Sequence, residues 1–377
     1  MEYLALGVLA AVILAGLAAT GVGGTVASGC TAVLCRIVGG KNCPFAAPVH
    51  ADAAKPAGPV PQRARTTAAA YPGPRPPIPR PTCDPNTKHA WTEGLHAHND
   101  YENKHPLDDA LHHGAVSVEA DVWADRNGRL WVSHADPAFQ CGRDPHSPCR
   151  SPGARGTLRD LYTKKLAARA RQNGGPIYAG RDQHFQLVIE QKQKQDPAAW
   201  RAITREVKEL PPSVDVVVSG GRPKNAIGRQ PPNVTFDTPA APGCKIPPRL
   251  DPASPHYNAA YARNFTVINA QWNSQFGGQG CGDKNKDGKI SPGEQRSLDR
   301  FVAKAHRDGY KLRFWGGPDG TIRINGEGGF VNCLIGYCSA GQRRDAWRAQ
   351  RKAGVDFLST HHLTMGEEYL RSCSNVR

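Results

Sequence analysis

From residue 91 onward, short β-branched segments alternate with longer amphipathic ones, and this alternation constrains the fold more than any other feature. We expect strands at 94–98, 116–123, 185–192, 214–219, 233–237, 265–271, 310–315 and 355–360. Helical patterns fall between them, at 106–113, 157–172, 197–209, 256–263, 293–308, 342–353 and 364–372. This order predicts an α/β chain that closes into a TIM (β/α)8 barrel, in which segment 128–135 pairs back onto the second strand.

Polar and aromatic side chains recur where the predicted strands end. They are His98, Glu119, Asp121, Glu190, Ser219, Arg222, Asp237, Trp272, Arg313, Trp315 and His361. Because chemistry in such barrels is carried by the carboxyl ends of the strands, this recurrence predicts one site at that face of the barrel.

Glu119 and Asp121 belong to a strand with period-two alternation, so both side chains project from the same face. Two adjacent carboxylates repel each other, and a hard divalent cation with oxygen ligands relieves the repulsion. His98 and His134 flank this pair in the sequence and can serve as a general acid and a general base.

Four short motifs carry a resemblance to a known family. They are His98-Asn99-Asp100, Glu102-Asn103, Glu119-x-Asp121 and His134-Ala135-Asp136. This pattern resembles the glycerophosphodiester phosphodiesterase and phosphatidylinositol-specific phospholipase C-like superfamily, with a distant similarity to sphingomyelinase D. The chain departs from that family's usual His-Arg-Gly motif, for which it has His-Asn-Asp. The resemblance covers about residues 94–373.

The resemblance implies a metal-dependent phosphoric diester hydrolase that cleaves glycerophosphodiesters or phospholipid headgroups. A catalytic Mg²⁺ or Ca²⁺ would be held by Glu119, Asp121 and Glu190. One of His98 and His134 would deprotonate the nucleophile, which is either water or a neighbouring substrate hydroxyl, and the other would protonate the leaving alcohol.

Five further residues are candidates for substrate binding: Asn99, Lys192, Arg222, Arg313 and Trp315. Lys192 either contacts a phosphate oxygen or neutralises the acids. The glycines before Arg222 either let backbone N–H groups approach an anion or form an ordinary turn. Arg222 itself either binds a phosphate or is a solvated side chain, and Arg313 has the same two interpretations. Trp315 either walls the pocket or fills the barrel mouth.

A second metal signal lies at residues 283–294, which fit the calcium-loop pattern D-x-[DN]-x-[DN]-G-x5-E of EF-hands. The expected ligands of this structural Ca²⁺ are Asp283, Asn285, Asp287, the carbonyl of Lys289 and Glu294. A helical pattern follows the loop, but none precedes it, so we expect a single half-hand.

Residues 3–22 are uncharged and apolar, and a run of this length matches a membrane-spanning helix. With Glu2 in front of it, the run resembles the N-terminal helix of Flp- and TadE-type pilins. We therefore expect a membrane-spanning segment at 1–43, a disordered Ala/Pro-rich linker at 44–90 and the catalytic barrel at 91–377.

The net charge of +15 suits anionic partners such as phosphodiesters and phospholipid surfaces. No basic stripe with interleaved aromatic residues occurs, so we expect no nucleic-acid partner. Eleven cysteines indicate an oxidising compartment, and hence a single-pass cell-membrane protein with a monomeric extracellular catalytic domain, or a secreted protein. Candidate disulfides are Cys141–Cys149, Cys333–Cys338, Cys244–Cys281 and Cys83–Cys373.

Two other functions fit the same sequence. The predicted anchor, spacer and calcium loop suit a surface-display module that binds without turnover. A toxin-like secreted phospholipase would share the chemistry of the first hypothesis and differ only in its target.

Overall fold

The computed structural model describes residues 77–78, 90–136, 155–181, 183–273, 280–285, 287–319 and 338–372, all within one compact unit, Thr67–Arg377. The predicted membrane-spanning segment 1–43 and nearly all of the predicted linker 44–90 lie outside these residues. In the part of the chain that is described, no helix is both long and apolar enough to cross a bilayer.

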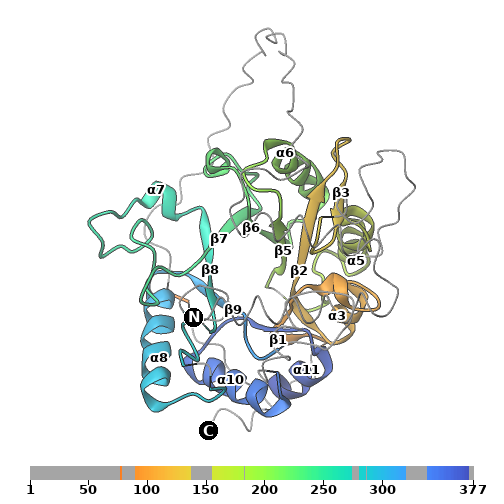
Figure 1. The fold of residues 1–377 in the computed structure, drawn as a ribbon. Helices are drawn as coiled ribbons and strands as arrows, with labels where there is room; N and C mark the ends of the chain where they lie inside the picture. Colours follow the sequence, from red (N-terminus) through yellow and green to blue (C-terminus); the bar gives the residue numbers. More distant parts are fainter. Residues whose placement is uncertain are drawn as a thin grey trace, which may run out of the picture. The chain divides into compact units, whose positions relative to one another are not determined.

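Parallel strands form the centre of the fold. They are β1 Thr92–Ala97, β2 Ala115–Ala124, β5 Phe185–Gln191, β6 Val214–Gly220, β7 Val234–Thr238, β8 Phe265–Gln271, β9 Lys311–Trp315 and β10 Leu358–Thr360. Their order is β10-β1-β2-β5-β6-β7-β8-β9. A parallel bridge between Arg313 and Phe357 brings the end of this order back to its start, and Figure 1 shows the resulting ring. The predicted α/β fold with a TIM-barrel-like parallel sheet is confirmed.

Two short strands extend β2 at one side of the ring. β3, Leu130–Val132, pairs antiparallel with β2, which confirms the strand expected within 128–135. β4, Gly156–Thr157, pairs antiparallel with β3.

Helices surround the strands, as Figure 1 shows. They are α3 Asp108–His112, α5 Lys164–Gln172, α6 Pro197–Glu206, α7 Ala259–Ala262, α8 Pro292–Arg307, α10 Ala340–Ala353 and α11 Leu363–Arg371. Shorter turns are η1 Asp100–Glu102, η2 Arg159–Thr163, η3 Val207–Glu209 and η4 Lys224–Ala226. The helical pattern at 157–172 thus begins as a π-helical turn, and the one at 256–263 is limited to α7.

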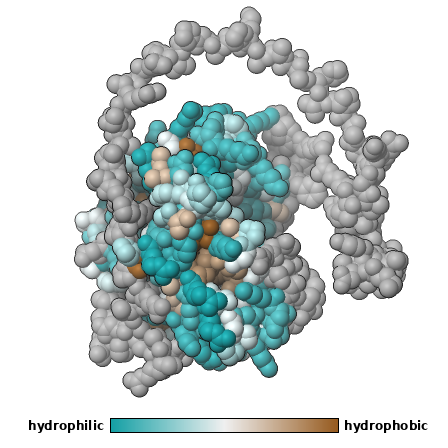
Figure 2. All heavy atoms as spheres, turned by 90° about the vertical axis from the view of Figure 1, so that its left-hand side faces the viewer, coloured by the Kyte–Doolittle hydropathy of each residue, from teal (hydrophilic) through white to brown (hydrophobic). Residues whose placement is uncertain are grey.

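The local sequence explains where α8 starts and which face it buries. Ser291 and Glu294 form a reciprocal capping box, and Pro292 occupies the first turn, where a missing N–H costs nothing. Leu298 and Val302, four residues apart, lie buried on one face of this helix. The space-filling view in Figure 2 looks at the side of the molecule that is on the left in Figure 1, and the coloured surface there is mostly hydrophilic.

Strand periodicity divides the barrel into an apolar outer layer and a largely polar interior. Side chains that alternate along the strands, such as Val118, Leu187 and Val216, belong to the main core. Val188, Val217 and Val267 form a separate small buried cluster. Residues two apart on a strand share a face, so the residue two positions after each of these valines projects into the barrel mouth.

Of the predicted disulfides, Cys244–Cys281 is present, and its two cysteines are separated by 37 positions. Cys338 is also disulfide-bonded. The remaining predicted partners, Cys83, Cys141, Cys149, Cys333 and Cys373, lie outside the described residues.

Candidate active site

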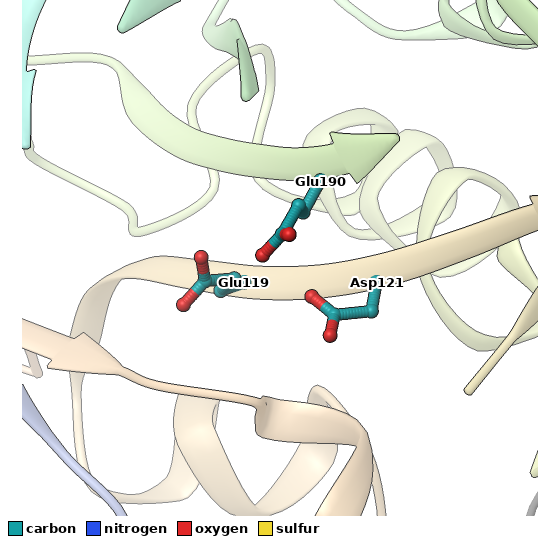
Figure 3. A group of neighbouring side chains, drawn as sticks. All are labelled: Glu119, Asp121 and Glu190. Atoms are coloured by element: carbon teal, nitrogen blue, oxygen red, sulfur yellow. The ribbon is translucent and has the colours of Figure 1, made fainter. Parts of the chain in front are cut away.

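Three carboxylates meet at the carboxyl ends of β2 and β5. Glu119 and Asp121 project from one face of β2, and the sheet register places Glu190 of β5 beside Asp121. Figure 3 shows the three side chains side by side along β2 and β5, with Asp121 and Glu190 extending toward Glu119. One oxygen from each lies within 4.8 Å of the other two, although Glu119 and Asp121 are almost fully buried. The strand period and the parallel pairing together therefore build an acidic cluster.

Lys192 neutralises part of this cluster. Its Nζ lies 3.1 Å from Asp121 Oδ2 and 3.3 Å from Glu190 Oε1. Burial and the neighbouring Asp121 carboxylate raise the pKa of Glu190 to about 7. Of the two interpretations of Lys192, the structure therefore supports the one in which it neutralises the acids. It lies at the edge of the acid cluster.

Arg313 is buried beneath the acids and does not line the mouth. Its Nη1 lies 2.8 Å from Glu119 Oε2, and its Nη2 lies 3.8 Å from Asp237 Oδ2. Although burial alone would raise the pKa of Glu119, the guanidinium holds it well below its usual range. The structure thus gives Arg313 protein carboxylates as partners, and a contact with substrate phosphate stays a prediction.

The two histidines singled out from the sequence lie against different acids of the cluster. His134 Nδ1 lies 2.9 Å from Asp121 Oδ2, and His98 Nε2 lies 3.5 Å from Glu119 Oε2. Burial lowers the pKa of His98, and His134 is close enough to contribute to that shift. The hydroxyl of Tyr101 donates to Asp121 Oδ2 at 3.0 Å and lies 3.4 Å from His134 Nδ1. The fold thus brings both imidazoles to the acidic cluster.

His96 has a structural environment. It is fully buried, with Nδ1 2.7 Å from the Ser117 hydroxyl and Nε2 2.8 Å from Arg313 Nη1. Burial and the neighbouring guanidinium lower the pKa of His96 to about 4, so the ring is neutral at pH 7.

A cavity of about 360 Å³ lies at the ends of β6 to β9. Arg222 and Trp315, both predicted to bind substrate, line it together with Ser219 and Asn269. Arg222 donates to the backbone oxygen of Asp237 at 2.8 Å, so this cation is partly engaged by the protein.

The glycines after Ser219 pack closely against the end of β5. The N–H of Gly221 donates to the backbone oxygen of Gln191 at 2.6 Å, which corrects the alternative in which it faces an anion. Gly220 has φ +75°, and a Cβ there would lie 2.8 Å from Glu190 Cγ. These glycines allow β6 to approach the end of β5 closely, so they shape the space around Glu190.

The loop after β1 is built around Asp100. Its carboxylate accepts hydrogen bonds from the Leu107 N–H at 2.6 Å and the Tyr162 hydroxyl at 2.9 Å. Asn99, the predicted substrate ligand before it, is buried in the left-handed region with φ 46° and ψ 49°. A non-glycine residue in this region is uncommon and often marks a functional loop.

The predicted calcium loop is a turn held by its own polar groups. Asp283 Oδ2 accepts from the Gly288 N–H at 2.9 Å, and Glu294 Oε1 accepts from the Lys284 N–H at 2.8 Å. Hydrogen bonds also link Asn285, Asp287 and Lys289. The two ends of the loop are therefore drawn together, with the first and last predicted ligands facing inward.

Sequence reasoning missed Tyr101 and the buried pair of Asp319 and Arg343. Tyr101 lies between the first and second motifs, and its adjacency to Asp100 and Glu102 was the available signal. Asp319 lies 3.0 Å from Arg343 Nε and accepts a hydrogen bond from the backbone N–H of His361. These two residues are far apart in the chain, so no local pattern could reveal the pair.

Comparisons with known proteins agree with this site. Residues 86–213 match the AIM6-like phosphodiesterase domain family. Altered inheritance of mitochondria protein 6 from Eremothecium gossypii is 48% identical over 54 residues, which are 13% of this chain. The match spans only 14% of that relative's length.

Solved structures of low sequence identity are also similar. A glycerophosphodiester phosphodiesterase from Parabacteroides distasonis has a TM-score of 0.44 at 15% identity, covering 74% of this chain and 98% of that one. A putative glycerophosphodiester phosphodiesterase from Galdieria sulphuraria has a TM-score of 0.41 at 12% identity, covering 75% and 99%. An Oleispira antarctica phosphodiesterase in complex with the product sn-glycerol-3-phosphate has a TM-score of 0.38 at 14% identity, covering 74% and 96%.

The family match includes β1, β2 and β5, and therefore all three acids and both histidines. The likenesses to pilins and to sphingomyelinase D stay predictions. Residues 86–213 thus match an AIM6-like phosphodiesterase domain, and the phosphodiesterase resemblance predicted from the histidine and carboxylate motifs is confirmed.

Proposed function

We propose that the chain is a metal-dependent phosphodiesterase acting on glycerophosphodiesters or phospholipid headgroups. The observation that carries the proposal is the cluster of Glu119, Asp121 and Glu190, with one imidazole against each of its two buried acids. A phosphodiester bound there would meet both a cation site and groups able to move protons.

The three acids fit a hard divalent cation. They provide only oxygen ligands, which Mg²⁺ and Ca²⁺ prefer, and their oxygens lie close enough to share one ion. The Oδ1 atom of Asp121 is buried and accepts no hydrogen bond from any described residue. A bound cation would satisfy this oxygen and would neutralise charge on the phosphoryl group.

The chain's own residues supply the proton transfers. One of His98 and His134 takes the proton of the nucleophile, and the other gives a proton to the leaving alcohol. The carboxylate of Asp121 orients His134 through Nδ1 at 2.9 Å. Lys192 offers a fixed positive charge beside the acids, where a phosphate oxygen would lie.

The alcohol portion of the substrate is assigned to the cavity beside Glu190. Gly220 forms part of the cavity wall and also contacts Glu190, so the cavity adjoins the acid cluster. Its polar residues and its indole wall, Trp315, suit a small hydroxylated group.

Phosphorus NMR of glycerophosphodiester and phospholipid panels with added Mg²⁺ tests the proposal. We expect hydrolysis that EDTA abolishes and that Asp121→Asn and His98→Asn reduce at least about 100-fold. Asp109→Asn, which removes a partly exposed acid paired with His105, is the matched control and should retain full activity. Turnover that is unchanged in both site variants would refute the proposal, and the product shows which P–O bond breaks.

We further propose that the loop at 283–294 binds a structural Ca²⁺, because its side-chain and carbonyl ligands follow the EF-hand spacing. Glu294→Gln is the informative variant, since glutamine preserves the capping box with Ser291 but removes the charge. In an Asp121→Asn background, which disables the acid cluster, Ca²⁺ should raise the melting temperature only while Glu294 is intact. An equal rise in both proteins would refute this site.

A further inference from the structure

Two cationic side chains that follow β6, Arg222 and Lys224, line the cavity at the ends of β6 to β9. Arg222 is held in place, because its Nη2 donates to the backbone oxygen of Asp237 at 2.8 Å and its guanidinium carbon lies 4.9 Å from the ring centre of Phe236. Its Nη1 lies 3.8 Å from Asp237 Oδ1, which is too far for a hydrogen bond. The N–H groups of Nη1 are therefore not used by any described residue.

The acids around this cavity do not cancel its positive charge. Among the lining residues the acid is Asp237, so one carboxylate stands against the two cations Arg222 and Lys224. Lys224 Nζ forms no ion pair with a carboxylate in the described part of the chain. Glu190 adjoins the cavity on the side of the acid cluster, where Lys192 Nζ already lies 3.3 Å from it. The lining therefore has a surplus of positive charge, which favours an anionic ligand.

The aromatic residues of the lining, Tyr261 and Trp315, do not make a cage for a quaternary ammonium group. Cages of this kind surround the cation with several aromatic faces. The guanidinium carbon of Arg249 lies 3.7 Å from the ring centre of Tyr261, so a cation of the protein already takes one face of this ring. A choline group in the cavity would also meet the like charges of Arg222 and Lys224.

We propose that this cavity selects a leaving alcohol that carries a phosphate group of its own, bound by Arg222 and Lys224. The inference rests on the proposed function and names the substrate class of the same site. Two cations suit a phosphate monoester, which carries almost two negative charges at pH 7. The volume of about 360 Å³ is near the lower end of the range for small-molecule sites, so one compact headgroup fits. Ser219 and Asn269 line the same space and offer polar contacts to the hydroxyl groups of such an alcohol.

Kinetics with three matched diesters test the proposal. In glycerophosphoglycerol phosphate, glycerophosphoglycerol and glycerophosphocholine, the second alcohol is anionic, neutral and cationic in turn. With Mg²⁺ present, we expect kcat/KM for the anionic diester to exceed that for the choline diester about 10- to 100-fold, the usual gain from hydrogen bonds to a charged group. Equal kcat/KM values, or a preference for the choline diester, would overturn the inference.

Variants locate the effect. Lys224→Gln removes an exposed charge and should lower this preference about 5-fold. Arg222→Gln should lower it further, and its melting temperature shows whether the lost contact with Phe236 has changed the fold. Lys208→Gln is the matched control, because this exposed lysine lies on η3, which precedes β6, whereas Lys224 follows the other end of that strand. A preference that Lys224→Gln leaves at the level of the control would overturn the assignment to this cavity.

Calorimetry separates this inference from the proposed function. EDTA is added so that no cation draws the ligand to the acid cluster, and the full chain is titrated with glycerol 3-phosphate, glycerol or choline. We expect glycerol 3-phosphate to bind more tightly than the other two, and Lys224→Gln to weaken its binding about 5-fold. If no diester is hydrolysed, the proposed function is refuted and this binding result decides the inference. Glycerol 3-phosphate that binds no better than glycerol, or equally well to Lys224→Gln, would overturn it.

Discussion

Replacing Arg313 with methionine tests the electrostatic design of the barrel mouth. The guanidinium is almost fully buried, and it is the cation closest to Glu119 Oε2, at 2.8 Å, among the described ion pairs of that acid. It also lies 3.8 Å from Asp237 Oδ2. Methionine fills similar space but carries no charge, so the variant isolates the loss of the cation.

The magnitude follows from these distances. With an effective dielectric constant near 20, unit charges attract by about 6 kcal/mol at 2.8 Å and about 4 kcal/mol at 3.8 Å. The variant no longer pays the desolvation cost of the guanidinium, and Asp237, whose pKa burial already raises, can take up a proton. Breaking a buried pair by removing one partner typically costs about 3–5 kcal/mol, and we expect the free energy of unfolding to fall by that amount.

Urea unfolding followed by tryptophan fluorescence at pH 7, with EDTA present, measures this loss. Arg129→Met is the matched control, because Arg129 pairs with Asp125 at 2.9 Å on the surface. Exposed pairs contribute less than about 1 kcal/mol, so this variant should unfold near the midpoint of the unmodified chain. If Arg313→Met costs no more than the control, the cation does not stabilise the buried acids and the reasoning fails.

Three further predictions concern stability. Burial raises the pKa of Asp100 from 3.8 to about 6. The stability that this shift contributes is therefore full below pH 3.8, and about 3 kcal/mol is lost as the pH rises through 6. Asp100→Asn should flatten this part of a pH series of urea midpoints, and an unchanged slope would contradict the shift. Gly220→Ala should destabilise the protein by about 1–3 kcal/mol and weaken Mg²⁺ binding measured by calorimetry, because φ is +75° and a Cβ would meet a backbone oxygen at 2.6 Å. The control Gly174→Ala, at φ +71° with open space around it, should leave the Mg²⁺ affinity intact. Equal Mg²⁺ affinity in the two variants would refute the close-approach argument. Reducing the Cys244–Cys281 disulfide, which closes a loop of 37 positions, should lower the stability by about 4 kcal/mol and so lower the melting temperature. The double variant Cys244→Ser, Cys281→Ser should show the same lower melting temperature. An unchanged melting temperature in both the reduced protein and the double variant would contradict this prediction.

The sequence by itself determined the order of the elements and the identity of the acidic cluster. Period-two alternation is a local property, so it showed that Glu119 and Asp121 share a face before any pairing was known. The positions of the β-branched segments predicted the parallel strands, and β5 and β8 begin and end within a residue of expectation. Both results depend only on residues close together in the chain.

Tertiary structure decided what each polar side chain contacts. Arg313 was a candidate substrate ligand on a late strand, and closure of the barrel places its guanidinium 2.8 Å from Glu119, which lies far from it along the chain. The pairing of β10 with β1 likewise sets His361 3.0 Å from His98, across 263 positions of chain. Charge pairing inside a closed barrel depends on which strand ends are neighbours, and that is fixed by the ring as a whole and not by any single strand.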